Sequence, residues 1–255
     1  MGILRTDAGP VAVVTLDWPE RRNALDIDAM RALGEALRAE AARPGVAAVV
    51  LTGNGAFCAG ADLRRVVSRQ SLSEDERRAD VRNAAQALIW AVVDAPVPVL
   101  AAIDGPAVGL GFDLALACDE RFVGREGWCM QGWGRIGAIP ATGGELLLRL
   151  RNPMLLWHLL ADQPRVDGPT CERWGLGWAV EEETALDAAL ARGTALAELP
   201  LPALHAYVRL ARSSIRAQLV EHLALCADEQ PSLLADRGIA GRIDRVLGVT
   251  KETTT

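Results

Sequence analysis

Two kinds of hydrophobic pattern alternate in the first part of the chain. Short apolar runs at 11–16, 46–52 and 99–103 predict strands, and the unbroken apolar character of the last two is typical of strands buried on both faces. Apolar positions recur at about every 3.6 residues over 27–41 and again from 81 to 93, which predicts two helices. This alternation of strand and helix favours a layered α/β fold.

Capping residues support both helices. Asp26 stands directly before the first periodic stretch and is a typical N-cap. Ser73 and Glu76 have the spacing of a capping box, in which each side chain satisfies a backbone amide of the other residue. Pro96 and Pro98 then end the second helical region.

The second half of the chain is predicted to be mostly helical, without a repeat of fixed period. The predicted helices cover 153–161, 184–198, 201–212, 214–227 and 231–247. A change in composition near residue 200 divides the chain into a core, 1–198, and a helical C-terminal segment, 199–255. The final residues, 251–255, are polar and are predicted to be disordered.

Composition excludes several classes of protein. The net charge of −6, with Lys251 as the only lysine, argues against general nucleic-acid binding. No apolar run approaches the ~20 residues that a membrane span requires, and no secretory signal is recognisable at the start. The five cysteines are scattered singly, which suits reduced thiols and offers no metal-ligand spacing. We expect a cytoplasmic protein without a metal, a nucleic-acid partner or a membrane partner.

Two glycine-rich turns carry the candidate chemistry, and each follows a predicted buried strand. They lie at 57–63 and 105–113. Glycine lets a backbone approach a ligand closely and leave an N–H exposed, although either turn alone also suits an ordinary strand–helix connection. The spacing in the second turn lacks the third glycine of a dinucleotide-binding fingerprint. Two such turns from neighbouring strands can direct two amides at one carbonyl oxygen.

Five segments in a fixed order resemble the enoyl-CoA hydratase/isomerase, or crotonase, superfamily. They are residues 19–25, 49–53, 57–63, 98–119 and 136–144. The resemblance implies an α/β spiral of repeated strand–strand–helix units with a helical C-terminal segment. It also implies a homotrimer, or a dimer of trimers, in which 199–255 provides the contacts. The substrate would be an acyl-CoA thioester, with no cofactor besides the coenzyme A of the substrate itself.

By the same resemblance, the backbone amides of Ala61 and Leu110 would form an oxyanion hole. Leu110 stands where the family usually has glycine, so its side chain must point away from the hole. Further residues are implied to contact the substrate: Ala59, Asp62, Leu63, Arg22 (at the CoA phosphates), Gly109, Trp133 and Pro140.

The catalytic carboxylates depart from the family pattern. Hydratases of the family use two, and here Asp113 stands at the first position, where glutamate is usual. The second position holds Trp133, whose indole can donate a hydrogen bond but cannot act as a base. Trp133 is also expected to lower the local dielectric and raise the pKa of Asp113. The dehalogenase branch carries tryptophan at this place, but its nucleophilic aspartate would fall at Ala141.

Two hypotheses remain. The first is an enzyme of the hydratase/isomerase type that uses Asp113 as its single acid/base group. The alternative is a non-catalytic acyl-CoA-binding protein that keeps the fold and the pocket. Glu145 and His205 are secondary candidates for the base, and His158 is predicted to be a packing residue.

Overall fold

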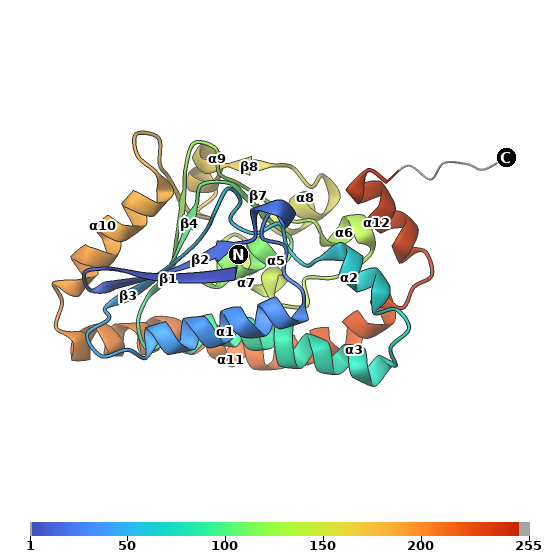
Figure 1. The fold of residues 1–255 in the computed structure, drawn as a ribbon, viewed down its shortest axis with the longest axis horizontal. Helices are drawn as coiled ribbons and strands as arrows, with labels where there is room; N and C mark the ends of the chain where they lie inside the picture. The colour runs from blue at the N-terminus through green and yellow to red at the C-terminus, as the bar shows by residue number, and fades with distance from the viewer. Residues whose placement is uncertain (1, 250–255) are drawn as a thin grey trace.

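The computed structural model describes residues 2–249 and contains two sheets (Figure 1). The larger sheet has the order β1-β2-β3-β4-β6-β9, and all neighbours are parallel except the antiparallel pair β1 and β2. Its strands are β1 (Gly2–Ala8), β2 (Val11–Asp17), β3 (Ala48–Gly53), β4 (Val99–Ile103), β6 (Glu120–Val123) and β9 (Trp178–Ala179). The smaller sheet, in the order β5-β7-β8, contains β5 (Pro106–Val108), β7 (Trp128–Met130) and β8 (Val166–Asp167).

Helices connect and cover these strands. In chain order they are η1 (Pro19–Arg21), α1 (Ile27–Ala41), α2 (Leu63–Ser68), α3 (Glu74–Asp80), the π-helical η2 (Val81–Gln86), α4 (Ala87–Val93), α5 (Leu110–Ala117), α6 (Trp133–Ile136), α7 (Gly144–Arg151), α8 (Leu155–Ala161), α9 (Gly168–Arg173), α10 (Ala185–Ala197), α11 (Leu201–Leu234) and α12 (Ile239–Leu247). Both predicted caps are confirmed: Asp26 accepts from the Ala29 amide at 2.9 Å, and Ser73 and Glu76 form a capping box.

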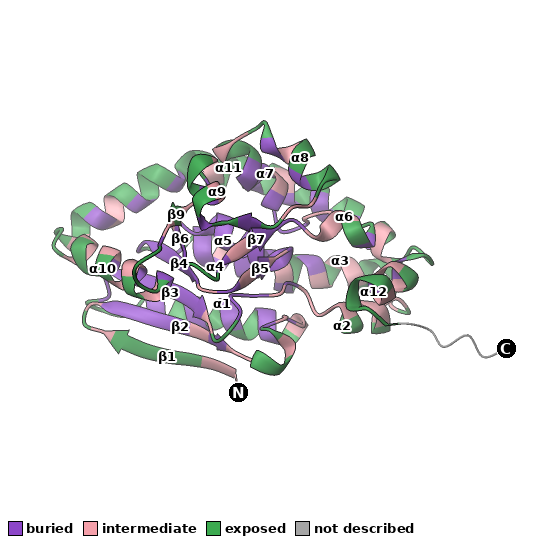
Figure 2. Ribbon diagram, turned by 90° about the horizontal axis from the view of Figure 1, so that it is seen from above, coloured by how far each residue is buried: buried purple, intermediate pink, exposed green. Residues whose placement is uncertain are grey.

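The central strands β2, β3 and β4 of the larger sheet are buried on both faces, as their apolar runs predict. Val11 and Val13 of β2 face α10, whereas Ala12 and Val14 belong to the main core that α1, α4 and α5 cover. Figure 2 shows β2, β3 and β4 in the buried colour, whereas β1 at the edge of the sheet is largely exposed. Alternate side chains of one strand therefore enter two different cores, and a strand in this position must be apolar throughout. The predicted α/β fold is confirmed.

The C-terminal helices differ from the prediction in their boundaries. The two predicted helices 201–212 and 214–227 form one continuous helix, α11, which extends to Leu234. The predicted break near 213 is wrong because tertiary contacts hold the chain in helical form there. The buried Arg212 donates to the Ala95 carbonyl at 2.6 Å and forms an ion pair with Asp119. Strand β1 was not predicted; it lies at the edge of the sheet, and its residues are mostly exposed.

Helix α11 spans the length of the molecule (Figure 1) and packs against α3, η2 and α7. The predicted boundary at residue 199 thus falls at the start of α11, although the end of the C-terminal segment and the tail 251–255 lie outside the described residues. Within residues 2–249, no helix has the length and apolar character needed to cross a membrane.

Candidate active site

The two glycine-rich turns are hydrogen-bonded to one another. The Cys58 amide donates to the Pro106 carbonyl at 3.0 Å, and the Val108 amide donates back to the Cys58 carbonyl at 2.9 Å. A Cβ atom on Gly111 would lie 2.1 Å from the Cys58 carbonyl oxygen. Gly60 has a φ of +99°, and a Cβ atom there would lie 2.6 Å from the Val108 carbonyl oxygen. Glycine at these two positions therefore permits the close approach of the turns.

The amides of Ala61 and Leu110 are free to bind a ligand. Within residues 2–249, neither amide donates a hydrogen bond to another group of the protein. Leu110 is the first residue of α5 and follows Gly109, whose φ is +53°. A Cβ atom on Gly60, beside Ala61, would lie 3.5 Å from the Leu110 nitrogen. Two free N–H groups, one of them at a positive helix end, therefore lie on adjacent turns, an arrangement that suits an oxyanion.

The Leu110 side chain does not block this site. It is 1% exposed and forms part of the main hydrophobic core. Its isobutyl group therefore packs into the core, while the residue still lines the smaller cavity.

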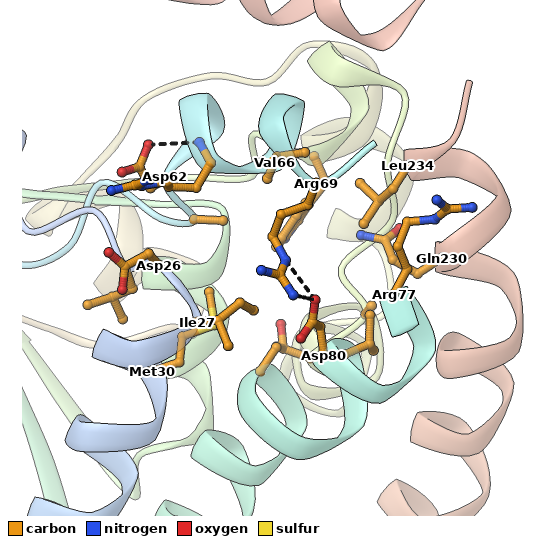
Figure 3. A pocket seen from close by; sticks show the side chains of 18 residues that line it. Asp26, Ile27, Met30, Asp62, Val66, Arg69, Arg77, Asp80, Gln230 and Leu234 are labelled. Carbon is orange, nitrogen blue, oxygen red and sulfur yellow. Dashed lines mark hydrogen bonds and ion pairs between the residues drawn. The ribbon is translucent and has the colours of Figure 1, made fainter. Parts of the chain in front are cut away.

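Two cavities meet beside Ala61 of the first turn. The larger one encloses about 740 Å³ of empty space, its open mouth included, and is lined largely by apolar side chains (Figure 3). The smaller one encloses about 490 Å³ on the same basis and is lined by Ala59, Leu63, Gly109, Leu110 and Ile136 among others. Ala61 and Trp133 line both cavities. A ligand held at the Ala61 amide can thus extend in two directions.

Asp113 is completely buried and accepts hydrogen bonds from three side chains. Thr142 Oγ1 donates to Oδ2 at 2.6 Å, Trp133 Nε1 donates to Oδ2 at 2.8 Å, and Gln131 Nε2 donates to Oδ1 at 3.4 Å. Gly144 leaves room for this carboxyl, because a Cβ atom there would lie 1.8 Å from Oδ1. Thr142 and Gln131 were not singled out from the sequence, and Gly144 was identified only as part of a family segment. The only signal was the position of Thr142 beside a glycine pair in a segment of the family pattern.

Burial raises the pKa of Asp113 from its ordinary value of 3.8 to about 6. The three hydrogen bonds oppose this rise, because they stabilise the charged carboxylate. The direction of the shift agrees with the prediction, but the role of Trp133 is more specific than predicted. Its ring fills space beside the carboxyl, whereas its N–H lowers the pKa.

Asp113 lines neither of the two cavities, although two of its partners do. Trp133 lines both, and Thr142 lines the larger one. The buried carboxyl therefore contacts the larger cavity through the Thr142 hydroxyl and the Trp133 indole.

The remaining predicted residues divide into those at the cavities and those that support the turns. Asp62 lines the larger cavity, but its carboxylate caps α2 by accepting from the Arg64 amide at 3.1 Å. Arg22 is exposed, and its carbonyl accepts from the Ala59 amide at 2.9 Å. Pro140 lines neither cavity.

Among residues 2–249, no three acidic, histidine or cysteine side chains come together as a metal site would require.

Comparison with known proteins identifies the family. The family model described as enoyl-CoA hydratase/isomerase matches residues 6–237. A relative from Rhodobacter capsulatus, whose name places it among the enoyl-CoA hydratases, is 34% identical over 228 residues, which cover 88% of this chain and 86% of the relative. The carnitinyl-CoA dehydratase of Salmonella enteritidis is 30% identical over 174 residues, covering 67% of this chain and 64% of that protein.

Solved structures show the same fold. The enoyl-CoA hydratase of Bacillus halodurans has a TM-score of 0.88 at 23% identity and covers 96% of this chain and 100% of its own. The chain therefore belongs to the enoyl-CoA hydratase/isomerase family and has its crotonase fold.

Proposed function

We propose that this protein is an enzyme that binds an acyl-CoA thioester with its carbonyl oxygen between the amides of Ala61 and Leu110. The observation that supports this most directly is the pair of free N–H groups on adjacent turns, one of them at Ala61, where the two cavities meet. The acyl chain would occupy the larger, mostly apolar cavity, and the pantetheine arm of CoA would leave through the smaller one. Family membership and the names of the relatives agree with a CoA thioester as substrate.

The chemistry of this site would be the formation of a thioester enolate. Removing a proton from the α-carbon moves negative charge onto the carbonyl oxygen, and two amides in a site with little water stabilise that charge. Their positions are set before the substrate arrives, because the turns that carry them are hydrogen-bonded together. The hole would therefore stabilise the enolate more than the ground-state carbonyl.

We assign proton transfer to Asp113 acting through Thr142. The Thr142 oxygen would take the α-proton as its own hydroxyl proton moves to Asp113 Oδ2, and the reverse transfer would return a proton to carbon. The other carboxylates of the larger cavity already have partners: Asp26 and Asp62 cap helices, and Asp80 pairs with Arg69. With Trp133 in place of a second carboxylate, proton exchange and double-bond migration are favoured over hydration.

The test is incorporation of deuterium at the α-carbon of butyryl-CoA in D₂O, followed by mass spectrometry. Thr142→Val keeps the shape and removes the hydroxyl, so exchange should fall by roughly 10²–10⁴-fold. Thr142→Ser keeps the hydroxyl and should retain most of the exchange. Equal exchange in the valine variant and the native protein would exclude the relay. Equal affinity for CoA and butyryl-CoA in calorimetry would exclude the oxyanion hole.

One observation favours a second candidate, a non-catalytic acyl-CoA-binding protein. Asp113 lines neither cavity, and all three of its hydrogen-bond partners hold it in place. Tight binding of butyryl-CoA by the native protein without any α-proton exchange would establish this function instead of the enzymatic one.

We also propose assembly as a homotrimer or a dimer of trimers through the C-terminal segment. Tyr207 and Leu210 lie three positions apart on α11 and are 66% and 71% exposed in the single chain, and such neighbouring side chains suit a contact between subunits. Light scattering that gives the mass of one chain would contradict this assembly.

A further inference from the structure

The larger cavity has polar groups on the side away from the glycine turns. Figure 3 shows Asp62, the neighbour of Ala61, on one side of the cavity and Gln230 on the opposite side, with Arg69 and Asp80 between them. An acyl chain that starts at the Ala61 amide and extends across this cavity would approach these groups. The hydrogen-bond donors that these groups leave unused therefore indicate which functional group the acyl chain carries.

Gln230 of α11 is a buried side chain with an unused donor. It is 3% exposed, and its Oε1 accepts from the Ile139 amide at 3.0 Å. This hydrogen bond fixes the orientation of the side-chain amide, because only the oxygen can accept from an N–H. Nε2 consequently lies on the other side of the group, and it donates to no other group within residues 2–249. The side chain is thus fixed and largely covered, while its free donor faces the cavity, where a bound ligand can supply the acceptor.

Arg69 also lines the larger cavity and is paired with Asp80. Its Nε and Nη2 both donate to one oxygen of Asp80, with Nε at 2.7 Å. Nη1 makes no hydrogen bond within the described part of the chain. The Arg69 side chain is 40% exposed, so this free edge remains accessible to solvent, and the ion pair holds the guanidinium beside Asp80 at the cavity, as Figure 3 shows.

The charges that line the larger cavity balance. Its basic residues are Arg65, Arg69 and Arg77, and its acidic residues are Asp26, Asp62 and Asp80. A carboxylate on the ligand would meet an arginine already paired with Asp80 and would add an unbalanced negative charge beside it. An uncharged oxygen would accept the same hydrogen bonds without that repulsion.

We propose that the acyl group taken up by this site carries an uncharged oxygen function, a hydroxyl or a carbonyl, that accepts a hydrogen bond from Gln230 Nε2. This inference rests on the proposed function, in which the larger cavity holds the acyl group. It makes Gln230 a specificity-determining residue. A plain hydrocarbon chain of the same length would cover Nε2 and remove its access to water without supplying an acceptor, which weakens binding.

The experiment compares affinities for two homologous series of CoA thioesters, one with plain saturated chains and one with a terminal hydroxyl. At the chain length that reaches Gln230, the hydroxyl should improve affinity roughly 3–10-fold over the plain chain, as one net hydrogen bond would. A third series with a terminal carboxylate should bind more weakly than the hydroxyl series. Plain chains that bind as well as hydroxylated ones at every length would overturn the inference, and so would tightest binding of the carboxylates.

Two substitutions test whether Gln230 is the source of the preference for hydroxylated chains. Gln230→Met removes the amide at similar volume, and Gln230→Glu keeps an acceptor for the Ile139 amide but removes both donors. Each should make the hydroxylated and plain chains bind equally. Gln218→Met is the matched control, because Gln218 is exposed on the same helix, and it should keep the native preference. A preference that survives both Gln230 variants would contradict the assignment.

The same measurements separate this inference from the proposed function. If no thioester binds more tightly than CoA itself, the proposed function fails and the inference fails with it. If plain acyl-CoA binds tightly and the hydroxyl gives no gain, only the inference fails.

Discussion

Trp133 Nε1 lies 2.8 Å from Asp113 Oδ2 and donates a hydrogen bond to it. The residue that stands in place of a second carboxylate is therefore bonded to the first one. The bond gives the buried carboxylate a partner and places the indole between it and both cavities. The protonation of Asp113 therefore depends on the hydrogen bond from Trp133.

Removing the indole donor should raise the pKa of Asp113 further. The Trp133 hydrogen bond stabilises the charged carboxylate, so Trp133→Phe should shift the pKa from about 6 upwards by roughly one unit. The pH profile of α-proton exchange would report this as a higher pH of half-maximal rate. Trp157→Phe, at a position that is 73% exposed, should leave the profile unchanged. An unchanged or lower midpoint in Trp133→Phe would show that the indole does not stabilise the charge.

The stability of the native protein should fall between about pH 4 and pH 6 relative to Asp113→Asn. The folded-state pKa of about 6 exceeds the ordinary value of 3.8, so the unfolded chain releases its proton first as the pH rises. Below pH 3.8 Asp113 is neutral in both the folded and the unfolded protein, and its contribution to the free energy of unfolding is complete. As the pH rises towards 6, the unfolded chain gains stability by ionising, and the folded protein loses about 3 kcal/mol relative to it. Urea unfolding of both proteins across this range would measure the difference. Parallel curves would argue against a raised pKa.

Two glycine-to-alanine substitutions should act in opposite directions. Gly144→Ala places a methyl group 1.8 Å from Asp113 Oδ1 and should destabilise the fold by about 3 kcal/mol. Gly241→Ala, in α12, has no neighbour within 4 Å of the new methyl and should stabilise by about 0.5–1 kcal/mol. Thermal unfolding of both variants provides the measurement. Native-like stability of Gly144→Ala would mean that Asp113 can move without cost.

The second amide of the proposed hole can be tested at Leu110. Proline is tolerated at the first position of a helix and removes only the N–H there, whereas alanine keeps the N–H and loses the same packing. Leu110→Pro should therefore lower α-proton exchange by roughly 10²–10³-fold relative to Leu110→Ala. Both variants should lose stability, because the leucine side chain belongs to the main core. Similar exchange rates in the two would show that the Leu110 amide does not bind the oxyanion.

Local signals in the sequence were sufficient for the elements that form the frame of the site. The strands β2, β3 and β4 and helix α1 were predicted because their side-chain patterns and the cap at Asp26 act over a few residues. The ordered family segments then identified the two turns. The length of α11 could not be predicted, because Arg212 binds carbonyls and a carboxylate more than 90 positions away in the chain.

The sequence by itself determined the α/β class, the family and the positions of Ala61 and Leu110 on two glycine turns. Only the tertiary structure decided what surrounds them. It placed Asp113 behind Trp133 and against Thr142, which is 29 positions away, and it brought Gln230 of α11 to the larger cavity. These relationships depend on how separate helices pack. Burial and hydrogen-bond partners across that packing set the pKa of a carboxyl and leave an amide donor free, and no local sequence pattern encodes them.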